Sequence, residues 1–266
     1  MRPLPALVTG AVAVAITATS VLAIAPTASA ATGGYVALGD SYSAGVGSTD
    51  DYLNDCDQST AAYPYLYQQA VSPSSFSFQA CTGATAPDIE SSQLSALGSG
   101  TSVVSLTDGG DDVGFGDVME DCVLYSQSYC LSQISSAEQQ ATTTLPATLD
   151  TLYSDIRSDA PNARVVVMGY PEIYDLSESS GCSGLSTASR TALDHAADVL
   201  DGVIQKQVAN YSGFTFADVR SYFSGHEICD SDSWINSVTW PIDDSYHPTA
   251  EGQADAYLPA FEAALN

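Results

Sequence analysis

Two short segments at opposite ends of the chain carry side chains with complementary catalytic chemistry. The first segment reads Gly39-Asp40-Ser41, and the second reads Asp244-Ser245-Tyr246-His247. A serine hydroxyl becomes a good nucleophile when a neighbouring base takes its proton. Imidazole titrates closest to neutral pH and suits that task. The pairing of Ser41 with His247 therefore predicts a serine hydrolase.

The far nitrogen of His247 requires a partner that holds the ring in position. Asp244 lies three residues earlier, within reach of that nitrogen, and is the third catalytic residue that we predict. The two other histidines have less suitable surroundings. His195 lies inside a helical pattern and His226 lies beside Cys229, so we predict structural roles for both.

Short apolar runs alternate with helical patterns along the chain, which is typical of an α/β domain with a parallel sheet. The predicted strands are Tyr35–Leu38, Phe76–Ala80, Val103–Leu106, Val165–Met168 and Phe214–Ala217. The predicted helices lie near Ala61–Ala70, Ile89–Ala96, Gln133–Arg157, Ser189–Ala209 and Ala250–Ala264. This order predicts a three-layer α/β/α sandwich of the flavodoxin-like kind, with about five strands.

The carboxyl ends of parallel strands meet at one edge of such a sheet, where ligands bind. Candidate site residues follow predicted strands or lie in the loop before the last helix, namely Ser41, Gly83, Asp111 and His247. We therefore expect them to meet in one site.

The first thirty residues resemble a secretory signal peptide. Arg2 precedes an apolar stretch, and Ala28-Ser29-Ala30 is a small-residue cleavage site, so we expect cleavage after Ala30. An uncleaved membrane anchor is the alternative, because the stretch is about long enough to span a bilayer. The remaining residues, 31–266, fit a single domain.

The composition indicates an exported, strongly acidic protein. Six cysteines lie in the mature part, and an even number in an exported chain predicts disulfides. Their spacings contain no zinc pattern. The chain has 32 acidic and 6 basic residues, which excludes a partner with a phosphate backbone such as nucleic acid. High solubility, salt adaptation and acid adaptation all remain compatible with this charge.

Four ordered motifs give the chain a resemblance to a known family. They are Gly39-Asp40-Ser41-Tyr42-Ser43, Cys81-Thr82-Gly83-Ala84, Gly109-Gly110-Asp111-Asp112 and Asp244-Ser245-Tyr246-His247-Pro248. Together they resemble the sequence blocks of the SGNH (GDSL-type) hydrolases. The stretch from Cys56 to Pro64 and the segment Gly225–Cys229 are similar to a branch of secreted actinobacterial lipases and phospholipases A1. The resemblance covers nearly all of the mature chain.

The resemblance implies ester hydrolysis without a metal or other cofactor. It implies an oxyanion hole formed by the N–H groups of Ser41 and Gly83 and the side chain at position 111. In this branch a backbone carbonyl two residues before the histidine can orient the ring, which makes Ser245 the alternative to Asp244. The implied disulfides are Cys56–Cys81, Cys122–Cys130 and Cys182–Cys229. We expect a monomer that acts on a small-molecule or lipid ester, with transient contact with a lipid interface.

Position 111 departs from the family pattern, which has asparagine there. Loss of one oxyanion donor typically costs about 10²–10³ in turnover, and an ionised Asp111 would repel the developing negative charge. A protonated Asp111 can donate, and burial beside other carboxyls can raise its pKa. The acidic run from Asp108 to Asp121 does not match an EF-hand, so we predict a solvated loop that contains the oxyanion motif.

Three functions agree with these patterns. The leading prediction is a secreted serine esterase that acts on lipid or phospholipid acyl esters. A carbohydrate deacetylase of the same superfamily is the second, and a secreted binding protein with a decayed oxyanion hole is the third. Because no binding role requires Ser41, Gly83 and His247 together, we favour an enzyme.

Overall fold

The computed structural model describes residues 33–177, 182 and 184–266. The predicted signal peptide, 1–30, lies outside the described residues. A five-stranded parallel sheet has the strand order β2-β1-β3-β4-β5. The strands are β1 (Gly34–Ala37), β2 (Ser75–Phe78), β3 (Thr101–Leu106), β4 (Arg164–Met168) and β5 (Phe214–Ala217). This order is that of flavodoxin-like sheets, the fold class that the sequence predicts.

Residue type explains which strands lie in the middle of the sheet. Most residues of β1, β3 and β4 are buried, as the central strands of a sheet covered on both faces should be. The edge strands β2 and β5 alternate aromatic residues with serine or threonine and are more exposed. The hydrophobic pattern of each strand therefore distinguishes the central strands of the sheet from its edge strands.

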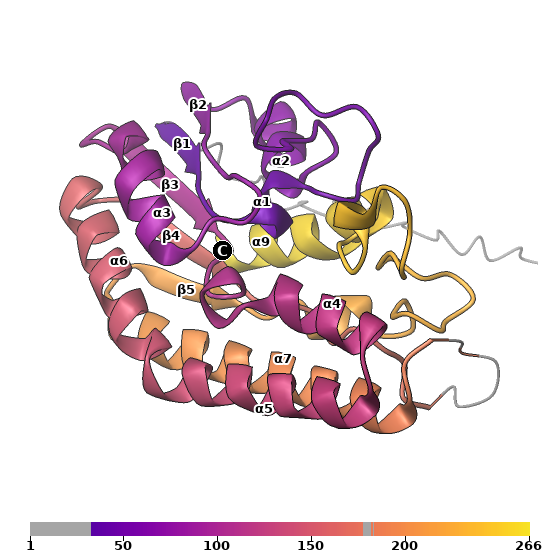
Figure 1. Ribbon diagram of the computed structural model, residues 1–266. Coiled ribbons are helices and arrows are strands. Elements are labelled where there is room, and N and C mark those ends of the chain that lie inside the picture. Colours follow the sequence, from indigo (N-terminus) through magenta and orange to yellow (C-terminus); the bar gives the residue numbers. More distant parts are fainter. Residues whose placement is uncertain (1–32, 178–181, 183) are drawn as a thin grey trace, which may run out of the picture.

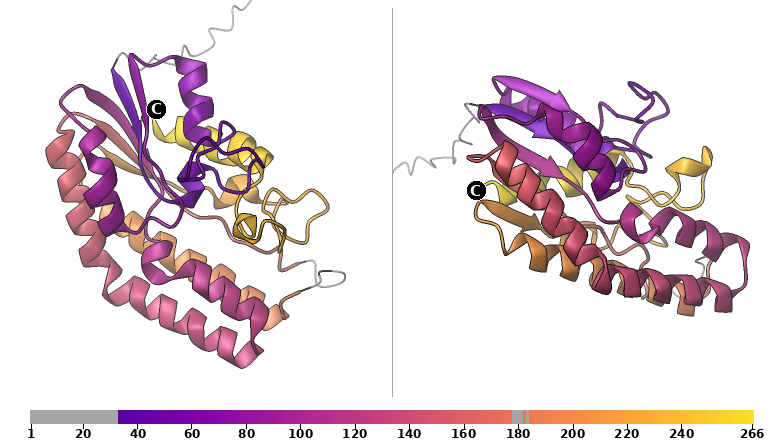
Figure 2. Two further views of the ribbon diagram at one scale, coloured as in Figure 1. Left: turned by 45° about the horizontal axis from the view of Figure 1, so that its top comes forward. Right: turned by 60° about the vertical axis from the view of Figure 1, so that its left-hand side comes forward.

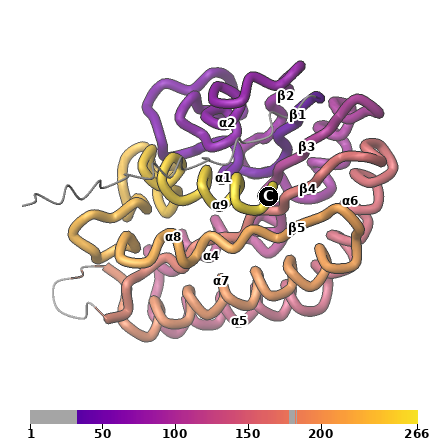
Figure 3. The backbone as a smooth tube through the Cα atoms, turned by 180° about the vertical axis from the view of Figure 1, so that it is seen from behind, coloured from indigo at the N-terminus to yellow at the C-terminus, as the bar shows by residue number. Residues whose placement is uncertain are grey.

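Helices cover both faces of the sheet (Figures 1 and 2). The α-helices are α1 (Ser41–Ala44), α2 (Tyr63–Val71), α3 (Ala86–Asp88), α4 (Phe115–Leu124), α5 (Gln127–Thr143), α6 (Leu145–Asp159), α7 (Thr187–Val208), α8 (Arg220–Phe223) and α9 (Leu258–Ala264). The 3₁₀ and π segments are η1 (Ile89–Gln93), η2 (Leu94–Ala96), η3 (Asp111–Val113), η4 (Ile242–Asp244) and η5 (Gly252–Tyr257). Helices α2 and α9 lie on one side, and α6 and α7 lie on the other, with α5 running beside α7 (Figure 3).

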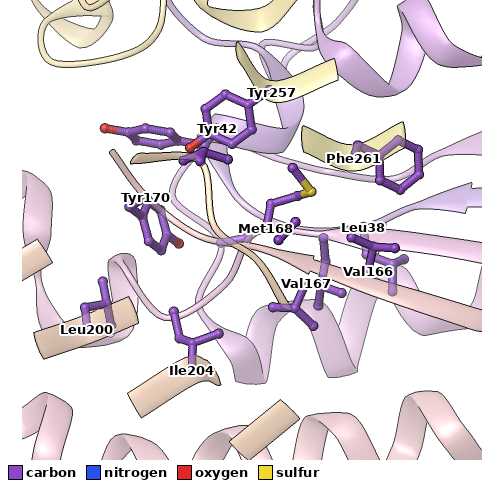
Figure 4. Packing of buried hydrophobic residues seen from close by; sticks show 14 of the residues in the cluster. Leu38, Tyr42, Val166, Val167, Met168, Tyr170, Leu200, Ile204, Tyr257 and Phe261 are labelled. Carbon is purple, nitrogen blue, oxygen red and sulfur yellow. The ribbon is translucent and has the colours of Figure 1, made fainter. Parts of the chain in front are cut away.

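The core on either side of β4 shows the three layers directly. Val166, Val167 and Met168 of β4 are buried in the middle layer. Tyr257 and Phe261 lie on one side of them, whereas Leu200 and Ile204 of α7 lie on the other (Figure 4). This arrangement is the predicted α/β/α sandwich.

Some helices differ from the prediction. The predicted helix Gln133–Arg157 is two helices that meet at Thr144, because Pro146 lies in the first turn of α6 and cannot continue the preceding helix. The predicted helix Ile89–Ala96 consists of a π turn and a 3₁₀ turn.

The prediction of a solvated loop from Asp108 to Asp121 is wrong. Residues 115–124 form α4, which buries Val118, Met119 and Cys122 on one face. Asp108 is completely buried. Acidic residues dominated the composition of the run and concealed the helical spacing of its apolar residues.

Three disulfides connect loops and helix ends around the sheet: Cys56–Cys81, Cys122–Cys130 and Cys182–Cys229. They match the pairing that the resemblance implied. None of the helices within the described ranges has the length and apolar character needed to cross a membrane.

Candidate active site

Ser41 lies at a sharp turn where β1 ends and α1 begins. Gly39 adopts a φ of +121°, and a Cβ there would approach the backbone oxygen of Thr107 to 2.6 Å, so only glycine fits. Asp40 then caps α1 by accepting a hydrogen bond from the Tyr42 N–H. As the first helical residue, Ser41 has an N–H with no acceptor within the helix.

The Asp40 carboxyl maintains the turn from a buried position. It accepts hydrogen bonds from the hydroxyl groups of Thr107 and Tyr170. Burial raises the pKa of Asp40, while the bonds from Thr107, Tyr170 and the backbone lower it. Thr107 follows β3 and Tyr170 follows β4, so both lie at the predicted edge of the sheet. The sequence motifs did not single out either residue, although each closely follows a predicted strand.

His247 lies directly beside Ser41. Its Nε2 is 2.8 Å from the Ser41 Oγ, and its ring lies 5.1 Å from the Tyr42 ring, centroid to centroid. The Tyr42 hydroxyl in turn donates to the Tyr246 carbonyl, which joins the histidine loop to the serine turn. Burial lowers the pKa of His247 to about 4, although the backbone carbonyls of Ser245 and Asp243 and the nearby carboxyls oppose this. The ring is therefore neutral near pH 7, as a general base must be.

The far nitrogen of His247 is buried and, within the part of the chain that the structure describes, has no partner in good hydrogen-bond geometry. The backbone carbonyl of Ser245 is the strongest of the influences that raise the His247 pKa. The Asp244 carboxylate instead accepts a 2.7 Å hydrogen bond from the Tyr52 hydroxyl, which also accepts from the Gly47 N–H. Asp244 thus connects two loops, a contact that our sequence analysis did not predict.

Gly83 and Asp111 line the same cleft as Ser41 and His247. Gly83 has a φ of +72°, which other residues rarely adopt. Burial raises the pKa of Asp111 to about 7, and the charges of Asp40, Asp112 and Asp88 add to this effect. Asp112 is held in place because its carboxylate accepts the Ala86 N–H. Asp111 is consequently neutral in acidic solution and can then donate a hydrogen bond.

The cleft has a volume of about 640 Å³ and runs past the Ser41–His247 pair. Phe115, Met119, Val123 and Leu124 of α4 line it, as do Val238 and Ile242 from the segment before the histidine loop. The large apolar side chains among these residues offer a surface on which an acyl chain could pack.

The two remaining histidines lie outside this cleft. His195 is on α7, with its Nε2 4.0 Å from Glu138. His226 stacks on Trp234 at 3.5 Å between ring centroids and contacts the Asp232 carbonyl through Nδ1. Neither histidine lines the cleft with Ser41, and their structural roles remain a prediction.

A serine beside a neutral histidine, at the carboxyl edge of a parallel α/β/α sheet and next to a cleft, is the arrangement of a serine hydrolase. Comparison with known proteins agrees with this class. Residues 37–254 match the GDSL-like Lipase/Acylhydrolase family. The chain is 52% identical over 239 residues to Lipase 1 of Streptomyces coelicolor, covering 88% of both chains.

Two solved structures are also similar. A phospholipase A1 from Streptomyces albidoflavus NA297 has a TM-score of 0.85 and 48% identity, with 88% of this chain and 100% of that chain covered. An extracellular lipase from Streptomyces rimosus has a TM-score of 0.84 and 46% identity, with 87% and 99% covered. The chain belongs to the GDSL-like lipase/acylhydrolase family and is a carboxylic ester hydrolase.

Proposed function

We propose that the protein is a secreted lipase that hydrolyses lipid or phospholipid acyl esters through an acyl-enzyme on Ser41. The observation that carries the proposal is the 2.8 Å contact between the Ser41 Oγ and the His247 Nε2 within an apolar cleft. The relatives named phospholipase A1 and lipase support the substrate class. The signal-like residues 1–30, the three disulfides and the extracellular relative from Streptomyces rimosus support secretion.

In the first half of the reaction, the Ser41 Oγ attacks the ester carbonyl carbon while the His247 Nε2 takes the hydroxyl proton. The resulting tetrahedral oxyanion accepts hydrogen bonds from the N–H groups of Ser41 and Gly83 and from the neutral carboxyl of Asp111. When the intermediate collapses, the C–O bond to the alcohol breaks and the protonated His247 donates its proton to the departing oxygen.

In the second half, a water molecule replaces the alcohol. His247 takes one proton from the water as its oxygen attacks the acyl-enzyme carbonyl, and it returns that proton to the Ser41 Oγ as the carboxylic acid leaves. Throughout the cycle the His247 ring must keep its orientation. We propose that the Ser245 backbone carbonyl provides this orientation, because the Asp244 carboxylate is hydrogen-bonded to Tyr52.

The test combines labelling with substitution. A fluorophosphonate should label Ser41, and Ser41→Ala should lose labelling and reduce ester turnover by about 10⁴ or more while its melting temperature changes little. His247→Ala should show a comparable loss, whereas the matched variants His195→Ala and His226→Ala should keep most of the activity. Labelling of a different serine, or an active Ser41→Ala enzyme, would refute the assignment.

A further inference from the structure

Large apolar side chains gather at the mouth of the cleft. Nine such side chains are exposed in the described part of the chain: Leu53, Val123, Leu124, Tyr125, Tyr129, Leu176, Val238, Trp240 and Ile242. Seven of the nine belong to two segments, 123–129 and 238–242. We call these seven side chains the apolar rim. Such a concentration is unusual, because exposed apolar residues on a soluble protein are normally scattered singly.

The rim is continuous with the walls of the cleft. Val123 and Leu124 of the first segment, and Val238 and Ile242 of the second, line the cleft together with Ser41 and His247. Tyr125 and Trp240 extend the same two segments outward, and Trp240 is 86% exposed. The rim thus borders the opening through which an ester must enter. Figure 1 shows the end of α4 and the loop before α9 on the same side of the molecule.

The segment that joins α4 to α5 is held firmly although it presents apolar side chains to solvent. Cys122 and Cys130, both buried, form a disulfide across it. The Tyr125 and Tyr129 rings pack edge to face at 5.2 Å between centroids. The buried face of α4 is provided by Val118, Met119 and Cys122, so the core does not require the outward side chains.

The charge around the rim determines which surface it fits. Among the described residues, five carboxyl side chains line the cleft and no lysine or arginine does: Asp40, Asp57, Asp111, Glu120 and Asp243. The net charge of the chain is −26. An anionic membrane would repel such a surface, since attraction to anionic lipid requires clusters of lysine or arginine.

We propose that the apolar rim is a docking surface that inserts into an electrically neutral, zwitterionic lipid surface and places the cleft opening against it. Aromatic residues such as Tyr125 and Trp240 suit this role, because their rings favour the boundary between headgroups and acyl chains. This proposal rests on the proposed lipid-ester function. Docking would allow an acyl chain to pass from the lipid into the cleft without crossing water.

The binding experiment uses the full mature chain with Ser41→Ala, so that vesicles remain intact. Sedimentation with phosphatidylcholine vesicles should show binding that persists at high salt and weakens when anionic phosphatidylglycerol is added. Combined Tyr125→Ser and Trp240→Ser substitutions should weaken binding about tenfold or more. Tyr65→Ser is the matched control, because Tyr65 is a partly exposed tyrosine on α2 outside the cleft, and it should bind normally.

A kinetic experiment separates the rim from the reaction itself. In the active enzyme, Tyr125→Ser with Trp240→Ser should lower the hydrolysis of vesicle phosphatidylcholine about tenfold, while turnover of a soluble short-chain ester stays within about twofold. Activity on the soluble ester together with unchanged vesicle binding by the double variant would overturn the rim proposal and leave the proposed function intact. Vesicle binding without hydrolysis of any ester would refute the function and leave the rim in place.

Two further results would overturn the proposal. Stronger binding to anionic than to zwitterionic vesicles would contradict the charge argument. A dimer in light scattering that becomes a monomer in the double variant would show that the rim pairs with a second copy of the chain.

Discussion

At the scale of single residues, Asp111 determines how activity should depend on pH. Neutral His247 is required as base, and its pKa is lowered to about 4 by burial. In the proposed mechanism Asp111 must be neutral to donate to the oxyanion, and its pKa is raised to about 7 by burial and neighbouring carboxylates. Both groups are therefore competent between about pH 4 and pH 7. The window is wide because burial moves the two pKa values in opposite directions from their usual order: it raises that of the carboxyl and lowers that of the imidazole.

Asp111→Asn should remove the alkaline limit of this profile, because an amide donates a hydrogen bond at any pH. We expect kcat/KM on a short-chain ester to rise at pH 8 by about tenfold or more, while the acidic limit near the His247 pKa stays in place. Asp112→Asn is the matched control. It removes a carboxylate that raises the Asp111 pKa, so its alkaline limit should stay or move to lower pH. An Asp111→Asn enzyme that is equal or slower at every pH would show that Asp111 does not face the oxyanion.

The orientation of His247 gives a second prediction at this scale. We expect Asp244→Ala to reduce kcat less than about tenfold, since removal of a true triad carboxylate costs about 10⁴. Tyr52→Phe, which removes the hydrogen bond to Asp244, should have a similarly small effect. Ser245→Ala keeps the backbone carbonyl and should remain active. A loss of about 10⁴ for Asp244→Ala alone would restore Asp244 as the third catalytic residue.

At the scale of elements, periodicity predicted the sheet better than the helices. All five strands were located within a few residues because each is a short apolar run with clear ends. Helix α4 was not predicted because it is rich in acidic residues. Helices α5 and α6 were predicted as one helix because only Pro146, in the first turn of α6, marks the boundary between them. These errors matter, since α4 forms a wall of the cleft.

The disulfides support a prediction about these elements. In the chain-entropy account, a disulfide stabilises the fold more when it closes a longer loop. Cys122 and Cys130 are 8 residues apart, whereas Cys182 and Cys229 are 47 apart. Replacing the first pair by alanine should lower the free energy of unfolding by about 2–3 kcal/mol, and replacing the second pair by about 4 kcal/mol. Urea unfolding measures both, and the reverse order would contradict the account.

At the scale of the whole molecule, buried carboxyls should make the fold most stable in mildly acidic solution. Burial raises the pKa of Asp194 to about 7 and that of Asp201 to about 8. Each accepts backbone hydrogen bonds through one oxygen and, among the described residues, leaves its second oxygen without a hydrogen-bond partner. The Arg220 guanidinium lies 3.7 Å from the second oxygen of Asp201 and only partly offsets the effect of burial. A protonated second oxygen avoids a buried charge.

The direction of the effect follows from linkage. The folded chain holds these protons more tightly than the unfolded chain, whose aspartates titrate near pH 4. The stabilisation is complete below about pH 4 and is lost as the pH rises toward the folded pKa values of about 7 and 8. Buried His247, with its lowered pKa, acts in the opposite direction and disfavours the fold below about pH 6.

We therefore expect the melting temperature to be higher at pH 5 than at pH 8 by roughly 5 °C or more, with self-repulsion of the −26 charge acting in the same direction. Differential scanning calorimetry at constant ionic strength tests this expectation. Asp201→Asn should reduce the difference, because an amide does not ionise, whereas exposed Asp159→Asn should not. A chain that melts higher at pH 8 would contradict this account.

The amino-acid sequence by itself indicated the strands, the parallel sheet and the expectation that Ser41, Gly83, Asp111 and His247 lie at one edge of it. It could do so because strand patterns and sharp turns are local, and parallel strands have their carboxyl ends at the same edge. The disulfide pairing required the family resemblance, since an even count of cysteines does not select partners.

The tertiary structure decided what each polar group contacts. Three side-chain hydrogen bonds illustrate this: Tyr52 with Asp244, Tyr170 with Asp40, and Tyr153 with Asp108. Their partners are 45 to 192 positions apart in the sequence. No local pattern encodes such contacts, because they arise when separate elements pack. The shifted pKa values of Asp111 and His247 and the gathering of exposed apolar residues at the cleft have the same origin. They depend on which surfaces the fold buries and which it leaves in solvent.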